Sequence, residues 1–163
     1  MNRGRFFCLV VAPALRSAWI YKLQNGVFFV VVFLMSYEFR MYPNRVEAFG
    51  LGRSLELCRQ AYNFLLEKLR AENKSRNQIQ HEIVELKKAR PEFKGVYSKA
   101  LQMEPYRLFS NLRSLTQLKK KGKKVGALRF KGKDWFKTFS YNQSGFRLEM
   151  VKSRKGILHL SKI

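Results

Sequence analysis

The sequence predicts an α+β fold in which one strand is followed by about three helices and then by a β-meander. Residues 36–42 alternate in polarity and are rich in β-formers, which indicates a strand. Apolar residues then recur at helical spacing as far as residue 121, and beyond Gly122 the period changes to two. We therefore expect a sheet that opens at 36–42, is interrupted by a helical insert at 44–121 and resumes at 125–160.

Capping patterns predict where the first two helices begin. Asn44 with Glu47, and Ser75 with Gln78, each place a side-chain acceptor three residues before a Glu or Gln, as in a capping box. The first helix is expected to extend to about Arg70, with an apolar stripe along one face.

Proline and glycine predict the later boundaries of the helical insert. The second helix has to end near Pro91, because proline cannot continue a helical hydrogen-bond pattern. A third helix is expected from about Ser98, with Pro105 kinking it or splitting it in two. Gly122 is suited to be its C-cap.

The meander is expected from four short segments that alternate in polarity and are separated by turn residues. The predicted strands are 125–130, 135–141, 146–151 and 156–160.

Charge is the most informative feature for function. The chain has 33 Lys and Arg against 11 Asp and Glu, a net charge of +22 over 163 residues, and 46% of its residues are hydrophobic. That hydrophobic content predicts a folded domain rather than a disordered basic tail. A surface this positive repels itself unless a polyanion covers it, so we expect a phosphate-bearing partner. The densest stretch, 113–137, contains a single acid, Asp134.

The residues needed for catalysis or metal binding do not cluster in the sequence. The Glu residues are scattered, Asp134 is the only Asp, and Cys8 and Cys58 form no CxxC pair. His81 and His159 have no partners at ligand spacing. We therefore expect no cofactor, no metal site and no enzymatic activity of this chain by itself.

The first 34 residues differ from the rest in carrying basic residues, no acid and two apolar runs, at 6–15 and 27–35. Each run is about half the roughly 20 residues that a membrane-spanning helix requires. We expect Met35 to be the natural start and residues 1–34 to be a hydrophobic extension. The alternative is a membrane anchor or signal at 6–35, with the cationic remainder lying against anionic lipid.

Four segments, in this order, resemble the N-terminal part of the OrfB/TnpB proteins of bacterial and archaeal insertion sequences. They are YEFRMYPN at Tyr37–Asn44, LELCRQAYNFLLEK at Leu55–Lys68, VYSKALQMEPYRLFSNLRSL at Val96–Leu115 and ALRFKGKDWFKTFSYNQSGFRL at Ala127–Leu148. These proteins are transposases understood as RNA-guided DNA endonucleases related to type V CRISPR effectors. The resemblance covers residues 35–163.

The resemblance implies a wedge-type β-barrel interrupted by a helical insert, which binds guide RNA and the guide–target duplex. In this family a later RuvC-like domain and a zinc ribbon follow, and the sequence ends before either. We therefore expect a fragment that binds RNA and DNA without cutting, in the cytoplasm and associated with the nucleoid. A separate nuclease part of the same element is an expected partner. The helical insert also resembles a DNA-binding helix-turn-helix. A second alternative, permitted by composition alone, is a ribosomal-type RNA-binding protein.

The expected phosphate contacts are the cations of the basic stretch, namely Lys119, Lys120, Lys121, Lys123, Lys124, Arg129, Lys131, Lys133 and Lys137. About eight such contacts would give a slope of log K against log salt near −7 for duplex DNA and near −6 for a single strand. Trp135, beside Asp134, is expected to be exposed and to stack on a base, whereas strand alternation places about half of the neighbouring aromatic side chains in the core.

Five further residues complete the candidate site. Arg40 and Tyr42 share one face of the first strand, which would face a ligand or simply solvent. Arg59 and Asn63 are four residues apart on a helix, so both could reach one backbone. Gln143 lies in a predicted turn, where it would hydrogen-bond a base or sugar, or shape the turn.

Overall fold

The computed structural model describes residues 7–11, 18–22, 28–32, 37–72, 74–138, 140–141, 144–152 and 155–163. Its contacts divide the chain into two units, Met1–Asn44 and Arg45–Ile163.

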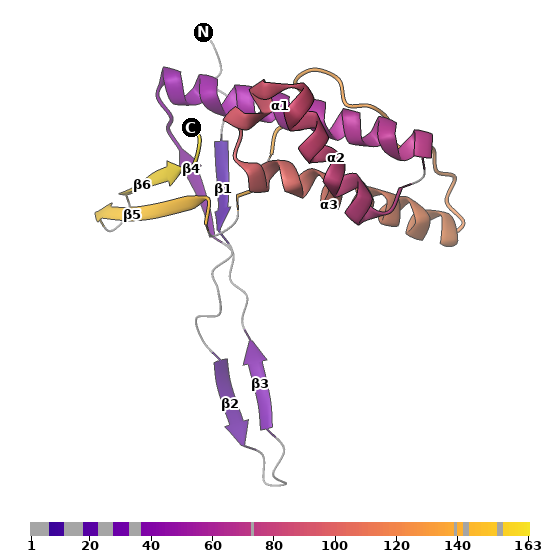
Figure 1. Ribbon diagram of the computed structural model, residues 1–163. Coiled ribbons are helices and arrows are strands. Elements are labelled where there is room, and N and C mark those ends of the chain that lie inside the picture. The colour runs from indigo at the N-terminus through magenta and orange to yellow at the C-terminus, as the bar shows by residue number, and fades with distance from the viewer. Residues whose placement is uncertain are drawn as a thin grey trace. The chain divides into compact units, whose positions relative to one another are not determined.

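The described part of the first unit consists of two nested antiparallel strand pairs. The strands are β1 (Phe7–Val11), β2 (Ala18–Lys22), β3 (Phe28–Val32) and β4 (Tyr37–Met41). β1 pairs with β4, with Leu9 opposite Phe39, and β2 pairs with β3, with Ile20 opposite Val30 (Figure 1). The strand expected at 36–42 is thus confirmed as β4. Its partner lies in the segment expected to be an extension, a pairing that the sequence analysis did not foresee.

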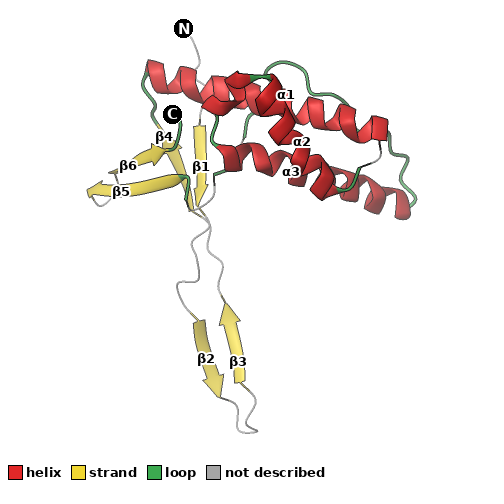
Figure 2. Ribbon diagram, viewed as in Figure 1, coloured by secondary structure: helices red, strands yellow, loops and turns green. Residues whose placement is uncertain are grey.

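Three helices form the core of the second unit. They are α1 (Arg45–Glu72), α2 (Arg76–Ala89) and α3 (Ser98–Lys120), and a short 3₁₀ helix, η1 (Pro91–Gly95), follows α2 (Figures 1 and 2). Each of the three packs against the other two. Among the described residues, no helix combines the length and apolar character needed to cross a bilayer.

The core is apolar and is contributed mainly by α1, α2 and α3. Its buried hydrophobic members are Leu51, Leu55, Leu57, Cys58, Ala61, Tyr62, Leu65, Leu66, Ile79, Ile83, Leu86, Phe93, Val96, Ala100, Leu101, Leu108 and Phe136. On α1 this burial starts only at Leu51, because Val46 and Phe49 in the first turns are exposed.

The predicted helix boundaries at 75 and 122 are confirmed. The Ser75 N–H donates to Gln78 Oε1 at 2.8 Å and the Gln78 N–H donates to Ser75 Oγ at 3.5 Å, which makes a capping box. Gly122 has φ +72°, and its N–H donates to the Lys119 carbonyl while the Lys123 N–H reaches the Leu118 carbonyl. This is the hydrogen-bond pattern of a Schellman motif.

α3 runs through Pro105 as a single helix, so the expected split there is wrong. Proline removes one helical hydrogen bond, but Pro105 is fully buried, as are Leu101 and Leu108 on either side of it. The packing of this face offsets the lost hydrogen bond, which propensity alone does not reveal.

The C-terminal hairpin consists of β5 (Phe146–Lys152) and β6 (Lys155–Leu160), paired antiparallel, and confirms the last two predicted strands. The strands predicted at 125–130 and 135–141 are wrong, because the described residues of both segments form neither strand nor helix. The α+β class is confirmed. In the described part of the chain each sheet has two strands, so the wedge-type barrel stays a prediction.

Candidate nucleic-acid interface

A stretch after α3 without helix or strand, residues 125–138, is held against the helices by side chains, and we call it the docked segment. At its centre Asn63 of α1 makes two hydrogen bonds to Lys131. Asn63 Nδ2 donates to the Lys131 carbonyl at 2.9 Å, and the Lys131 N–H donates to Asn63 Oδ1 at 2.8 Å. The asparagine thus satisfies both backbone hydrogen-bonding groups of Lys131, which lies between the two predicted strands.

Arg59 of α1 binds the same backbone carbonyl, that of Lys131. Its Nη1 donates to the Lys131 carbonyl at 2.6 Å, and its Nε donates to Glu56 Oε2 at 2.8 Å. The hydrogen bond from Arg59 lowers the pKa of Glu56 to about 2, so the carboxylate stays charged and holds the guanidinium in place. Arg59 and Asn63 do reach one backbone, as their spacing indicated, but it is the protein's own.

Two more arginines fix the two ends of the docked segment. Arg70 of α1 donates to the Leu128 carbonyl, and its guanidinium lies 4.7 Å from the centre of the Phe130 ring. Arg107 of α3 donates to the Thr138 carbonyl at 2.9 Å. Side chains of two helices, α1 and α3, therefore set the path of the segment.

Phe136 is the apolar anchor of the docked segment. It is 8% exposed, its ring centre lies 5.7 Å from that of Tyr62, and the Arg107 guanidinium lies 4.6 Å from its own ring centre. Its neighbour Trp135 is 66% exposed, as expected from the sequence. Phe130 is 51% exposed, so two aromatic rings of the segment present area to solvent.

The cations predicted to contact phosphate remain largely exposed. Five lysines lie in the last turn of α3, at its C-cap and just beyond it, and we call them the lysine cap; they are Lys119, Lys120, Lys121, Lys123 and Lys124. None of them forms an ion pair with an acid of the described residues. Arg129, Lys133 and Lys137 are also exposed, while Lys131 is half-buried with its Nζ 5.2 Å from the centre of the Trp135 ring.

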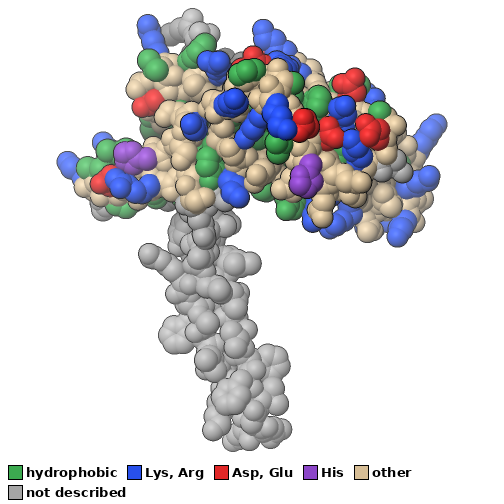
Figure 3. Space-filling model, viewed as in Figure 1, with side chains coloured by type: hydrophobic (Ala, Val, Ile, Leu, Met, Phe, Trp, Pro, Cys, Tyr) green, Lys and Arg blue, Asp and Glu red, His purple; other side chains and the backbone are tan. Residues whose placement is uncertain are grey.

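Figure 3 shows how the charges are distributed on one face of the molecule. Lys and Arg side chains are spread over much of the described surface, whereas Asp and Glu occupy a few spots. The lysine cap follows the C-terminal end of a helix, where the helix dipole favours positive charge. The helix dipole therefore offsets part of the repulsion among these lysines.

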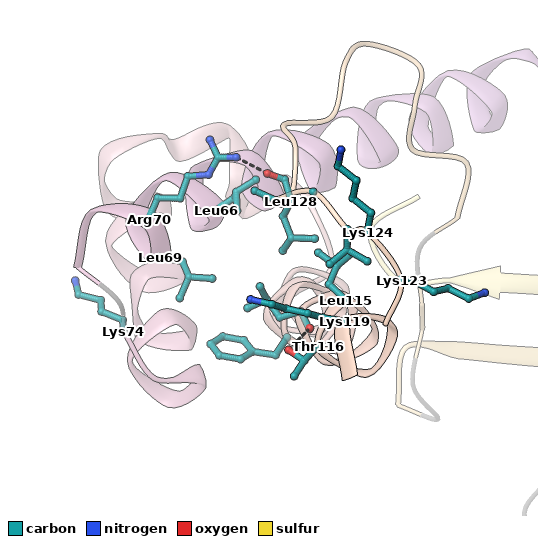
Figure 4. Close-up of a pocket in the computed structure, with 15 residues that line it drawn as sticks. Leu66, Leu69, Arg70, Lys74, Leu115, Thr116, Lys119, Lys123, Lys124 and Leu128 are labelled. Atoms are coloured by element: carbon teal, nitrogen blue, oxygen red, sulfur yellow. Dashed lines mark hydrogen bonds between the residues drawn. The ribbon is translucent and has the colours of Figure 1, made fainter. Parts of the chain in front are cut away.

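A groove with a volume of about 690 Å³ lies between α1, α3 and the start of the docked segment. Its floor is apolar and comprises Leu66, Leu69, Phe109, Leu112, Leu115, Val125 and Leu128. Its other lining residues include the cations Arg70, Lys74, Lys119, Lys123 and Lys124, and no acid (Figure 4). This groove was not predicted from the sequence, although the leucine spacing on α3 continues past the buried core and is a signal for it.

A buried carboxyl group on α3 was also not predicted from the sequence. Glu104 on α3 is 1% exposed, and its Oε2 receives no hydrogen bond from the described residues. The nearest counter-charge is Arg107, with Nη1 3.6 Å from Oε2. Burial raises the pKa of Glu104 to about 7, and it raises the pKa of the Cys58 thiol to about 12. A glutamate within a helix is usually exposed, so the sequence does not indicate that Glu104 is buried.

The remaining predicted residues lie elsewhere. Arg40 and Tyr42 belong to the first unit, and Tyr42 is 83% exposed. Gln143 lies outside the described residues. Within the ranges that the structure describes, no three His, Cys, Asp or Glu side chains come together as metal ligands.

Comparison with protein-family models, with curated proteins and with solved structures finds no match to this chain. The resemblance to the OrfB/TnpB family therefore stays a prediction that depends on the four sequence segments.

Proposed function

We propose that this chain binds nucleic acid and does not cut it by itself. The observation that carries the proposal is the docked segment with the adjoining lysine cap. It combines exposed cations with exposed aromatic rings on a backbone that helix side chains hold in place. Cations with interleaved aromatic rings are the combination that contacts a phosphate backbone and its bases together.

Electrostatics favours this function over a purely structural role for the lysines. Clustering five lysines within six residues at the end of α3 costs free energy through mutual repulsion, and a polyanion removes that cost. Each neutralised phosphate also releases counterions, which drives binding at low salt. The fixed backbone lowers the conformational entropy that the interface loses when it binds.

The resemblance suggests a finer form of the proposal. The chain would be the nucleic-acid-binding front of a transposon-encoded, RNA-guided endonuclease, contacting guide RNA and the guide–target duplex. A strand before the helices and a hairpin after them are compatible with an interrupted barrel of the wedge type. The nuclease would then be a separate part of the same element.

A binding titration of the whole chain across a salt series tests both levels of the proposal. The ligands are RNA transcribed from the 3′ end of the chain's own locus, scrambled RNA of the same length, and duplex DNA. We expect tight, salt-dependent binding, with a preference for the cognate RNA that survives at about 0.3 M salt. Equal binding to all three ligands would reject the guide-RNA form, and no binding at low salt would reject nucleic-acid binding altogether.

A further inference from the structure

We propose that the groove between α1, α3 and the docked segment takes an unstacked base of a single-stranded nucleic acid. The inference rests on the proposed function and specifies its substrate as single-stranded. The base would lie on the apolar floor, and its flanking phosphates would lie on the rim.

The groove has the size and polarity for such an occupant. At about 690 Å³ it is within the range of small-molecule pockets, and its floor combines leucines with the half-buried ring of Phe109. A nucleobase has an apolar face and polar edges, and the groove is open, so those edges can keep their contact with water.

Charge around the groove matches an anion and differs between its two sides. On the α1 side, Lys74 is paired with Glu72 and Glu82, and Arg70 is engaged with the Leu128 carbonyl. On the α3 side, the lining lysines belong to the lysine cap, and Figure 4 shows Lys119 reaching across the groove while Lys123 points away from it. The phosphates are therefore expected on the α3 side.

The position of Arg70 distinguishes a nucleic acid from other anionic, partly apolar ligands. Arg70 lines the groove and also stacks on the exposed Phe130 ring, so the groove and the stacking rings of the docked segment adjoin each other. A strand that stacks one base on Phe130 would bring its next nucleotides to the mouth of the groove. Bases in a duplex are already stacked and paired, so a duplex could not occupy it.

The test uses the whole chain and a ten-nucleotide RNA, compared with the same strand carrying abasic sites. Leu115→Asn places an amide on the floor, and Leu118→Asn is the matched control, since Leu118 lies on the same helix but does not line the groove. We expect the intact chain to prefer the base-bearing strand by about five-fold or more. Leu115→Asn should lower that preference without changing the affinity for the abasic strand, and Leu118→Asn should leave both unchanged.

A second variant separates the groove from the exposed rings and serves even if Leu115→Asn does not fold. Phe130→Ala with Trp135→Ala removes the stacking rings at exposed positions. Part of the base preference should survive in that double variant. Complete loss of the preference there, or equal behaviour of Leu115→Asn and Leu118→Asn, would overturn the groove as a base site while leaving nucleic-acid binding intact.

Two other outcomes also overturn the inference. If neither RNA strand binds, the proposed function fails and the groove site fails with it. If Leu115→Asn weakens binding of an amphipathic Leu/Glu peptide but not of RNA, the occupant is an acidic protein segment instead.

Discussion

Two groups of cations lie near the docked segment, and they differ in what they contact. Arg59, Arg70 and Arg107 donate to backbone carbonyls at three points of the segment. The lysine cap projects from the end of α3 and has no such contacts among the described residues. The planar guanidinium suits fixed hydrogen bonds, whereas the flexible ammonium stays hydrated until an anion arrives. Charge alone thus does not identify a basic residue as a binding residue. We expect mutation of the arginines to change mainly stability, and mutation of the lysine cap to change mainly binding.

The largest expected effect concerns the anchor of the docked segment. Phe136→Ala should lower the free energy of unfolding by about 3–5 kcal/mol, because it opens a cavity against Tyr62 and Arg107. Chemical denaturation measures this, with Phe130→Ala as the control at an exposed position of the same segment. Equal, small losses in the two variants would mean that the segment is not docked in solution.

The buried carboxyl group next to Arg107 should make stability depend on pH. The folded-state pKa of Glu104 is raised to about 7 from an ordinary 4.5, so the folded chain holds the proton more tightly than the unfolded chain. With respect to this group, the free energy of unfolding is highest below pH 4.5. It falls by about 3 kcal/mol in all as the pH rises through 7, because the buried carboxyl group then has to ionise. Cys58, with a pKa of about 12, does not titrate in this interval.

Glu104→Gln should therefore be more stable than the parent chain at pH 8 and should lose this part of the pH dependence. Urea denaturation between pH 5 and pH 8 measures the difference between the two proteins. Glu85→Gln, at an exposed position, is the matched control. A stability difference between Glu104→Gln and the parent that does not change with pH would contradict the buried, protonated carboxyl group.

Asn63→Ala tests whether docking of the segment and binding of RNA depend on different residues. It removes both hydrogen bonds to Lys131 and should cost about 2–3 kcal/mol of folding stability, while the salt dependence of RNA binding stays the same. Thermal unfolding and a salt titration of one sample set check both parts. Asn77→Ala, at an exposed position of α2, should change neither quantity. A changed salt slope in Asn63→Ala would mean that docking and binding are not separable.

Trp135→Ala should have the smallest effect and should act on binding alone. Trp135 is mostly exposed, and one contact of its ring is already made by Lys131, so we expect the loss of a weak base stack of about 1 kcal/mol. Affinity for a single-stranded RNA, compared with its abasic counterpart, measures it. A loss of stability instead would identify the tryptophan as part of the core.

The sequence predicted those features of the fold that depend on local chemistry. The capping box at Ser75 and the glycine cap at Gly122 are decided within one helical turn, and both were correct. The face of α1 that is buried was also predictable, but Val46 and Phe49 were not, because spacing identifies a face and not the turns that have a neighbour.

The features that were predicted wrongly or not at all depend on contacts between residues far apart in the sequence. Residues 125–130 and 135–141 alternate in polarity as strands do, yet Arg70 donates to the Leu128 carbonyl and Arg107 donates to the Thr138 carbonyl within them. Arg59 and Asn63, which were predicted to contact nucleic acid, hydrogen-bond to the Lys131 backbone, a contact that their sequence spacing does not indicate. Glu104 and the groove escaped prediction for the same reason, since burial and concavity arise only when α1 and α3 pack.

The most direct test replaces all five residues of the lysine cap by Gln and measures RNA binding across a salt series. A control with the same change in net charge replaces Lys88, Lys94, Lys99, Lys152 and Lys155, which are exposed elsewhere in the second unit. The account predicts that the cap variant unfolds at the parental temperature while its salt slope becomes shallower by about 3–4, with little change in the control. Equal loss of slope in both variants would contradict a localised interface and leave only a general attraction between a positive protein and RNA.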